Sequence, residues 1–249
     1  MWPPECHSSY AFSMIPTIFL FIALELKVDK VLSIFENATP EIQYCYIENI
    51  RDGRGYTAGK AGFTTGTGDF YEFAKNYEKV NQETVLKKYL PELKRLAQEE
   101  SEDVKGLRGM VKAWRSECHR KDFEGAQDAL VEAMYKSPAR AYQRQLGFSS
   151  ALSYLVIYDT LIQHGDGDDP DSFQGVLKRM GKARDEKQFL KKFLEAREQI
   201  LLNASDDSTR AEWRESVDRV YALRRILEEG NLSLEKLHLS VWGKDWQIE

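Results

Sequence analysis

The 249-residue sequence predicts an α+β fold that is mainly α-helical and contains one small antiparallel β-sheet. Three observations support this class. Apolar residues recur at helical spacing in most of the chain. A single run, Gln43–Ile50, is rich in β-forming residues and leads into a glycine-dense loop. A hydrophobic content of 42% is enough for a core, and the charged fraction of 30% is mixed in sign, which argues against disorder.

Composition also limits the classes of partner. The net charge is −5 and no block of lysine and arginine stands out, so we expect no nucleic acid partner, whereas a cationic substrate is compatible. The three cysteines, Cys6, Cys45 and Cys118, lie too far apart for a zinc motif, and the four histidines are scattered. We therefore expect no metal and no cofactor. Cys45 and Cys118 form either a disulfide, in an oxidising compartment, or two buried thiols.

The N-terminus contains an apolar run, Met14–Leu24, of 11 residues. That length suits the core of a signal peptide and is too short to span a membrane. No basic residue precedes the run and no clear cleavage site follows it. We interpret residues 1–23 as an atypical secretion signal, which predicts a secreted protein with one domain over residues 24–249 and no membrane partner. The alternative is that the run begins the first buried helix.

The first helix is predicted to begin near Leu24 and to end at Glu36. Val28, Val31 and Phe35 lie on one apolar face, and the segment Asn37–Pro40 ends the helix. A carboxylate at a helix C-terminus beside an apolar surface is disfavoured in its charged form by the helix dipole and by desolvation. Both effects favour protonated Glu36, which suits a general acid.

A second carboxylate follows the predicted strand. Asp52 opens the loop that continues with Gly53, Arg54 and Gly55, and residues 56–63 are expected to return as a second strand. Glycines allow tight turns and close approach of the backbone to a ligand. Arg54 would hold Asp52 ionised, so the two carboxylates would be kept in opposite protonation states. That contrast is how acid and base roles are assigned, although an Asp before Gly is by itself more often a turn residue.

The rest of the chain is predicted to be helical as far as residue 225. The expected helices are Phe70–Val80 (capped by Asp69), Thr84–Glu99 (kinked or broken at Pro91), Val104–Cys118, Asp122–Tyr135, Ser149–His164, Gln188–Leu202 and Asp206–Arg225. Two aromatic residues of the tail, Trp242 and Trp246, are expected to close the core.

Two charged residues do not fit their helical positions. Asp159 shares a face with Leu152, Leu155 and Ile162, so it should be buried and should need a cation. Arg210 lies in a first helical turn, where the dipole disfavours a cation, and this suggests a role away from its own helix.

Other chemistries lack their motifs. The glycine-rich segment has no GxxxxGK[ST] run and no strand–GxGxxG–helix pattern, which argues against nucleotide binding. There is no GxSxG motif, and no histidine shares a motif with Cys45 or Cys118, which argues against a nucleophilic hydrolase.

The segments ENATPEIQYCYIEN, DGRGYTAG and GFTTGTGD resemble the chitosanases of glycoside hydrolase family 46. The likeness is dense over about 35 residues and continues, more weakly but in the same order, to about residue 215. It implies a lysozyme-like fold of two mainly helical lobes, with the small sheet at the cleft between them. It also implies endo-acting hydrolysis of β-1,4 linkages between glucosamine units of chitosan.

The resemblance assigns catalytic roles to three residues. Glu36 matches the general acid, Asp52 the general base that activates water, and Thr57 the threonine that helps to place this water. The implied mechanism is a single displacement with inversion, for which the two carboxyl groups should lie about 6.5–9.5 Å apart.

Six further residues match positions that bind substrate or support the acid. Tyr46, Arg54 and Asp69 match residues that line sugar subsites. Asp159, Arg197 and Arg210 match a network that supports the catalytic glutamate.

The sequence departs from the family at two places, and other functions stay open. Arg51 replaces a glycine before Asp52, and an acidic subsite residue has no clear counterpart around Asn203. The alternatives are a non-catalytic polysaccharide-binding protein and a chitin or peptidoglycan hydrolase on the same fold. The expected partners are chitosan or glucosamine oligosaccharides, and the expected state is a monomer.

Overall fold

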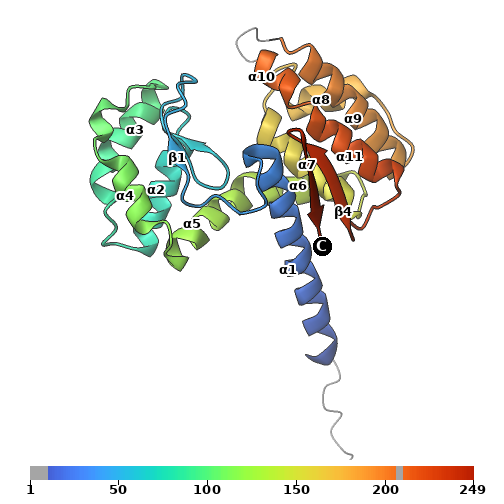
Figure 1. The fold of residues 1–249 in the computed structure, drawn as a ribbon, viewed down its shortest axis with the longest axis horizontal. Coiled ribbons are helices and arrows are strands. Elements are labelled where there is room, and N and C mark those ends of the chain that lie inside the picture. The colour runs from blue at the N-terminus through green and yellow to red at the C-terminus, as the bar shows by residue number, and fades with distance from the viewer. Residues whose placement is uncertain (1–10, 206–209) are drawn as a thin grey trace, which may run out of the picture.

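The computed structural model describes residues 11–205 and 210–249, and these form two lobes of mainly helical structure (Figure 1). The smaller lobe contains β1 (Ile47–Glu48), β2 (Thr57–Ala58), β3 (Phe63–Thr64), α2 (Asp69–Val80), the 3-10 turn Lys87–Tyr89, α3 (Leu90–Glu99), the 3-10 turn Val104–Leu107, α4 (Met110–Glu117) and α5 (Lys121–Val131). The π-helical turn Glu132–Lys136 joins the two lobes. The larger lobe contains α6 (Ser137–Gln145), α7 (Ala151–His164), α8 (Phe173–Met180), α9 (Glu186–Leu202), α10 (Arg210–Glu215), α11 (Asp218–Glu228), β4 (Leu237–Val241) and β5 (Lys244–Ile248). The predicted mainly helical α+β class is confirmed.

Helix α1 (Ala11–Asn37) runs beside the larger lobe, and its C-terminal end lies at the junction of the lobes (Figure 1). Val28, Val31 and Phe35 are fully buried, as their spacing predicts. The helix ends before Pro40, with Ala38 in the left-handed region at φ 52°. The predicted C-terminal position of Glu36 is therefore confirmed.

The beginning of α1 differs from the prediction, because the helix starts at Ala11 and not near Leu24. Residues 1–10 of the predicted signal segment lie outside the described residues. Leu20 and Phe21 are more than half exposed. In residues 11–205 and 210–249, no helix combines the length and the apolar character needed to cross a membrane. The interpretation of residues 1–23 as a secretion signal remains a prediction.

The three-stranded antiparallel sheet is smaller than predicted, because β1 covers only two residues of the run Gln43–Ile50. Ile47 pairs with Ala58, and Thr57 pairs with Thr64. Before β1 the backbone turns, and the carbonyl of Tyr44 accepts hydrogen bonds from the Trp114 and Gln127 side chains. The β-forming composition is correct, but these tertiary contacts replace strand pairing over the first half of the run.

The smaller lobe is built around buried aromatic rings. Phe73 packs against Phe63, Tyr77, Trp114 and Phe123 at centroid distances of 5.0–5.9 Å. Such edge-to-face and offset contacts stabilise a core beyond the area that they bury. The cluster fixes α2, α4 and α5 under the sheet, and thus gives the groove a rigid wall.

A disulfide joins Cys45 to Cys118 across 73 residues of sequence. It attaches the segment before β1 to the residue that follows α4. The sequence left a disulfide and two free thiols open, and the structure shows the disulfide.

Several predicted helices are divided by local features. Pro91 lies in the first turn of α3, so the predicted break in Thr84–Glu99 is confirmed. Gly109, at φ 88°, separates the Val104–Leu107 turn from α4. The predicted helix Asp206–Arg225 is two helices, α10 and α11, and residues 206–209 of it lie outside the described residues. Helix α6 and the β4–β5 hairpin were not predicted.

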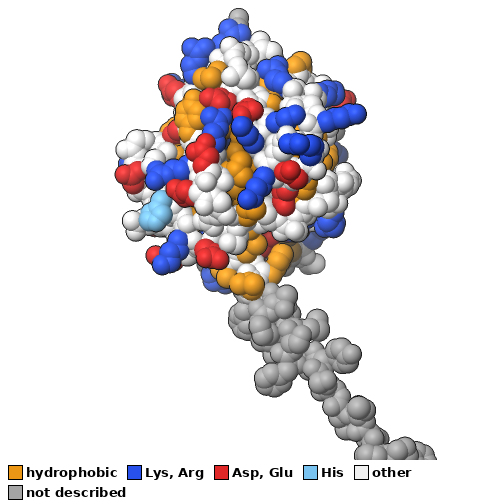
Figure 2. Space-filling view, turned by 90° about the vertical axis from the view of Figure 1, so that its right-hand side faces the viewer, with side chains coloured by type: hydrophobic (Ala, Val, Ile, Leu, Met, Phe, Trp, Pro, Cys, Tyr) orange, Lys and Arg blue, Asp and Glu red, His pale blue; other side chains and the backbone are white. Residues whose placement is uncertain are grey.

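The larger lobe surrounds α7, which is buried on nearly all sides. Asp159 lies on α7 and is completely buried, as its spacing predicts. The outer face of this lobe carries Lys and Arg side chains among Asp and Glu side chains (Figure 2). Charge of mixed sign on this face offers no continuous basic surface for a polyanion.

Candidate active site

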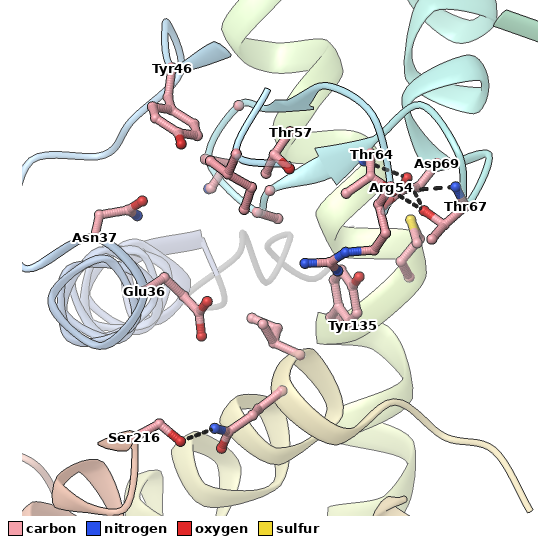
Figure 3. Close-up of a pocket in the computed structure, with 18 of the residues that line it drawn as sticks. Glu36, Asn37, Tyr46, Arg54, Thr57, Thr64, Thr67, Asp69, Tyr135 and Ser216 are labelled. Atoms are coloured by element: carbon pink, nitrogen blue, oxygen red, sulfur yellow. Dashed lines mark hydrogen bonds between the residues drawn. The ribbon is translucent and has the colours of Figure 1, made fainter. Parts of the chain in front are cut away.

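A groove of about 620 Å³ lies between the lobes, and the C-terminal end of α1 reaches its edge (Figure 3). The smaller lobe and the linking π-helical turn contribute Tyr46, Ile50, Arg54, Thr57, Gly59, Lys60, Ala61, Gly62, Thr64, Thr67, Asp69, Met134 and Tyr135. The remaining wall comes from Glu36, Asn37, Ile162, Gln163, Trp213, Ser216 and Arg219. The groove is thus lined largely by polar and aromatic side chains, and these come from both lobes.

Glu36 extends from the end of α1 into the groove (Figure 3). Its side chain is 35% exposed, and Oε1 accepts a hydrogen bond of 2.8 Å from Nη1 of Arg219. Arg219 also donates to the backbone carbonyl of Phe35 at 2.9 Å. These two bonds hold the last turn of α1 and orient the carboxyl group, which leaves Oε2 available on the groove side.

A buried ion cluster lies behind Glu36. Asp159 pairs with Nη1 of Arg197 at 2.5 Å and with Nη1 of Arg219 at 3.3 Å. Both arginines are buried, and Arg197 also donates to Gln163 and His164. Burial alone lowers the pKa of a guanidinium, but the carboxylates of Glu36 and Asp159 outweigh burial and raise the pKa of Arg219. Arg197, Asp159, Arg219 and Glu36 therefore form one connected chain of ion pairs with alternating charge.

The role predicted for Arg210 stays a prediction, and the structure adds a second arginine to the network. Arg210 begins α10 and its Nε donates to the carbonyl of Ala204, whereas Arg219 is the arginine that contacts both Glu36 and Asp159. The sequence argument placed a cation beside Asp159 correctly, and Arg197 is confirmed there. The resemblance and the helix-dipole argument both pointed to Arg210, and neither pointed to Arg219. The sequence signal for Arg219 would have been its place beside Val220, among the residues of α11 that are buried.

His164 is buried beside this cluster and is held neutral. Its Nδ1 lies 2.6 Å from the carbonyl of Asp171, and its Nε2 accepts from Nε of Arg197, so the proton resides on Nδ1. Burial, and then the positive charges of Arg197 and Arg219, lower the pKa of His164 well below 6.5.

This pKa predicts a pH-dependent loss of stability. Below about pH 6.5 the unfolded chain binds a proton at His164 that the folded chain does not bind, so the stabilising contribution is lost as the pH falls. The His164→Gln variant should therefore show a shallower decrease in the free energy of unfolding between pH 7.5 and pH 5.5, by at most about 1.4 kcal/mol per pH unit. Urea unfolding at several pH values measures the slope. The exposed-site variant His238→Gln is the control and should keep the wild-type slope, and equal slopes for all three proteins would contradict the prediction.

The loop after β1 places Asp52 beside Arg54. Oδ2 of Asp52 accepts from Nε and Nη2 of Arg54 at 2.8 and 2.6 Å, and Oδ1 accepts from the backbone N–H of Arg54 at 3.1 Å. The expected contact of these two residues is therefore present. The Arg54 side chain lines the groove, while Asp52 lies behind it and does not belong to the lining.

Thr57 faces the groove from β2 (Figure 3). Its hydroxyl is buried, and among the described residues it has no hydrogen-bond partner. A buried hydroxyl without a partner is destabilising unless water or a ligand satisfies it. Thr57 thus marks a position in the groove wall where a bound oxygen would be favourable.

Asp69 forms the far end of the groove floor. Its Oδ1 accepts from the backbone of Thr64 and Phe70 and from the hydroxyl of Thr67, all at 2.7–3.0 Å. Asp69 is the first residue of α2, and Gly68 rather than Asp69 is the cap. Burial raises the pKa of Asp69, and these hydrogen bonds oppose the rise. They fix the carboxylate in place and leave Oδ2 available to a ligand.

Tyr46 and Tyr135 both line the groove and come from different segments of the chain (Figure 3). Tyr46 was expected here, but Tyr135 was not. Burial, followed by the negative charges of Asp69 and Glu36, raises the pKa of Tyr135 to about 12. Tyr135 belongs to the π-helical turn that joins the lobes, and π-helical turns often occur at functional sites. The composition of residues 132–136 contains no signal for such a turn.

The only group of potential metal ligands close together in the described part of the chain is Cys45, Cys118 and His119. Both cysteines belong to the disulfide, so the group offers no thiolate to a metal ion.

Comparison with known proteins supports the interpretation of this groove. The model of glycosyl hydrolase family 46 matches residues 30–237. A curated relative from Bacillus subtilis (strain 168), described as a chitosanase, is 49% identical over 216 residues, which cover 84% of this chain and 78% of the relative.

Solved structures agree in fold. The crystal structure of native chitosanase from Bacillus subtilis MY002 has a TM-score of 0.85 and 46% identity, covering 91% of this chain and 98% of that chain. A glutamate-to-alanine variant of the same organism's chitosanase was solved in complex with six glucosamine units and has a TM-score of 0.85, 45% identity and the same coverage.

Proposed function

The chain belongs to glycosyl hydrolase family 46, and from this premise we propose that it hydrolyses β-1,4 linkages between glucosamine units in the interior of chitosan chains. The observation that carries the proposal is the arrangement around the groove. Glu36 enters from one side, and Thr57 faces the groove from β2 on the other side. Arg54 lines the groove on that side as well and pairs with Asp52 in the loop between β1 and β2. Hydrolysis with inversion needs an acid and a base on opposite faces of the sugar, with room for water.

The proposed mechanism is a single displacement. Glu36, protonated at Oε2 and oriented by Arg219, donates its proton to the glycosidic oxygen. Asp52, held in place by Arg54, takes a proton from the attacking water, and the unsatisfied hydroxyl of Thr57 holds this water. The C–O bond to the leaving sugar breaks as the C–O bond to water forms, so the anomeric configuration inverts.

Substrate binding is proposed for Tyr46, Arg54 and Asp69. The amines of chitosan are positively charged at mildly acidic pH, and a fixed carboxylate such as Asp69 would attract them. The proposed supporting network consists of Asp159, Arg197 and Arg219, which keep the carboxyl group of Glu36 in one orientation.

We also propose that the protein is exported. The disulfide between Cys45 and Cys118 supports this, because disulfides persist in oxidising compartments. Together with the apolar run Met14–Leu24, it favours an extracellular enzyme that meets its polymer outside the cell.

The proposal predicts the products of a glucosamine hexamer. Early in the reaction, NMR should show shorter oligomers with the α-anomer in excess at the new reducing end, because inversion of a β-linkage yields α.

The Asp52→Asn variant should lose about 10²–10⁴-fold in kcat, since a general base contributes this much. The variant should still bind the hexamer.

The exposed Asp168 offers a matched control, and Asp168→Asn should retain wild-type kcat. An excess of β-anomer would refute inversion. Binding of the hexamer without product would indicate a polysaccharide-binding protein. Faster cleavage of the fully acetylated hexamer would indicate a chitin hydrolase.

A further inference from the structure

A second pocket, of about 400 Å³, continues the groove beyond Glu36. Glu36, Asn37 and Tyr46 line both the groove and this pocket, so the two spaces adjoin. The wall that belongs to the second pocket alone includes Trp242 and Gln43. An oligosaccharide that lies along the groove would extend into this pocket once it is long enough.

Trp242 stands at the tip of the β4–β5 hairpin in an unusual backbone conformation. Trp242 and Gly243 form the two-residue turn, with φ of 57° and 67°. Turns with two positive φ values favour Asn-Gly or Asp-Gly, and a bulky residue there is an outlier. Such strain persists only where the surroundings fix it, and it is concentrated at functional sites.

Three hydrogen bonds fix Trp242. The indole Nε1 donates to the carbonyls of Ile34 and Phe35, the residues that precede Glu36, and the backbone N–H donates to Oδ2 of Asp218. The side chain nevertheless remains 38% exposed. Trp242 was expected to close the core, but the structure instead presents its ring to the second pocket.

The chemistry of this pocket suits a sugar ring bound by its apolar face. Its polar side chains, apart from Glu36, are the neutral Asn37, Thr39 and Gln43, which suit hydroxyl groups. A rigid aromatic ring supplies contact area with little loss of conformational entropy. We propose that Trp242 is the stacking platform of an additional sugar subsite, which binds a unit of the chain by its C–H face and hydroxyls. The proposal rests on the proposed function of the groove.

The experiment must separate this role from simple anchoring of α1. Anchoring would affect Glu36 for every substrate, whereas a subsite affects only substrates long enough to reach it. The measured quantity is therefore kcat/KM for glucosamine oligomers from trimer to hexamer. Trp242→Asn removes the ring and suits a positive φ, while Trp242→Phe keeps a flat ring but removes the Nε1 donor.

Trp242→Asn should lower kcat/KM about tenfold for the hexamer and less than about twofold for the trimer, as expected for the loss of one aromatic contact. Trp242→Phe should retain most of the preference for the hexamer. Trp246→Phe, on the same hairpin but outside the pocket, is the control and should match the wild type. An equal loss at all lengths for Trp242→Asn would overturn the subsite. If the wild-type protein cleaves no glucosamine oligomer, the proposed function itself fails.

Discussion

Glu36→Gln is expected to reduce kcat on the glucosamine hexamer by about 10²–10⁴-fold, because general acid catalysis contributes this much. Glutamine keeps the size and the hydrogen-bond acceptor that Arg219 needs, but it has no acidic proton to donate to the leaving oxygen. Steady-state release of reducing ends measures kcat. Calorimetric titration with the hexamer should show that the variant still binds substrate.

The control for this prediction is Glu195→Gln, an exposed glutamate on α9 that should leave kcat unchanged. Circular dichroism of Glu36→Gln should match the wild type, since the substitution is nearly isosteric. Activity of Glu36→Gln within about tenfold of wild type would mean that another group supplies the proton.

Arg197→Met is expected to lower the free energy of unfolding by about 3–5 kcal/mol, because it leaves a buried charge without its main partner. Arg197 and Asp159 are both fully buried, and Arg219 remains as the second contact of Asp159 at 3.3 Å. His164 and Gln163 also lose the donor that satisfies them. Urea unfolding monitored by tryptophan fluorescence measures the change.

Two variants make this prediction specific. Arg197→Met combined with Asp159→Leu should lose less stability than Arg197→Met alone, because the double variant leaves no unpaired carboxylate. Arg225→Met removes an exposed ion pair with Glu229 and should cost less than about 1 kcal/mol. If the single and double variants were equally unstable, lost packing rather than the unpaired charge would explain the effect.

The spacing of apolar residues predicted most of the helices, because a helix that buries one face needs apolar residues at helical spacing along that face. The face of α1 that contains Val28 and Phe35 is buried as predicted, and the helix ends beyond Glu36. Breaks at Pro91 and Gly109 follow from backbone chemistry, although only the first was predicted. The β4–β5 hairpin was missed because its turn, Trp242–Gly243, lacks the residues that usually form such a turn.

The candidate site was predictable to the extent that its residues belong to one segment. Residues 35–71 contain the proposed acid and base together with Thr57, and the resemblance to family 46 assigned their roles. Arg219, Tyr135 and Trp242 come from distant parts of the chain and were missed. Each depends on the packing of one helix or hairpin against another, which no local pattern encodes.

The sequence by itself determined the mainly helical class, the position of Glu36 at a helix end, the burial of Asp159 and its need for a cation. These follow from periodicity and from the free energy of burying charge, both of which are properties of a single segment. Only the tertiary structure decided that Arg219 joins Glu36 to Asp159, and that Cys45 and Cys118 are bonded. It also decided that Trp242 borders the second pocket instead of the core. The physical reason is that these contacts join residues 60 to more than 200 positions apart, and the choice of partner depends on how the two lobes pack.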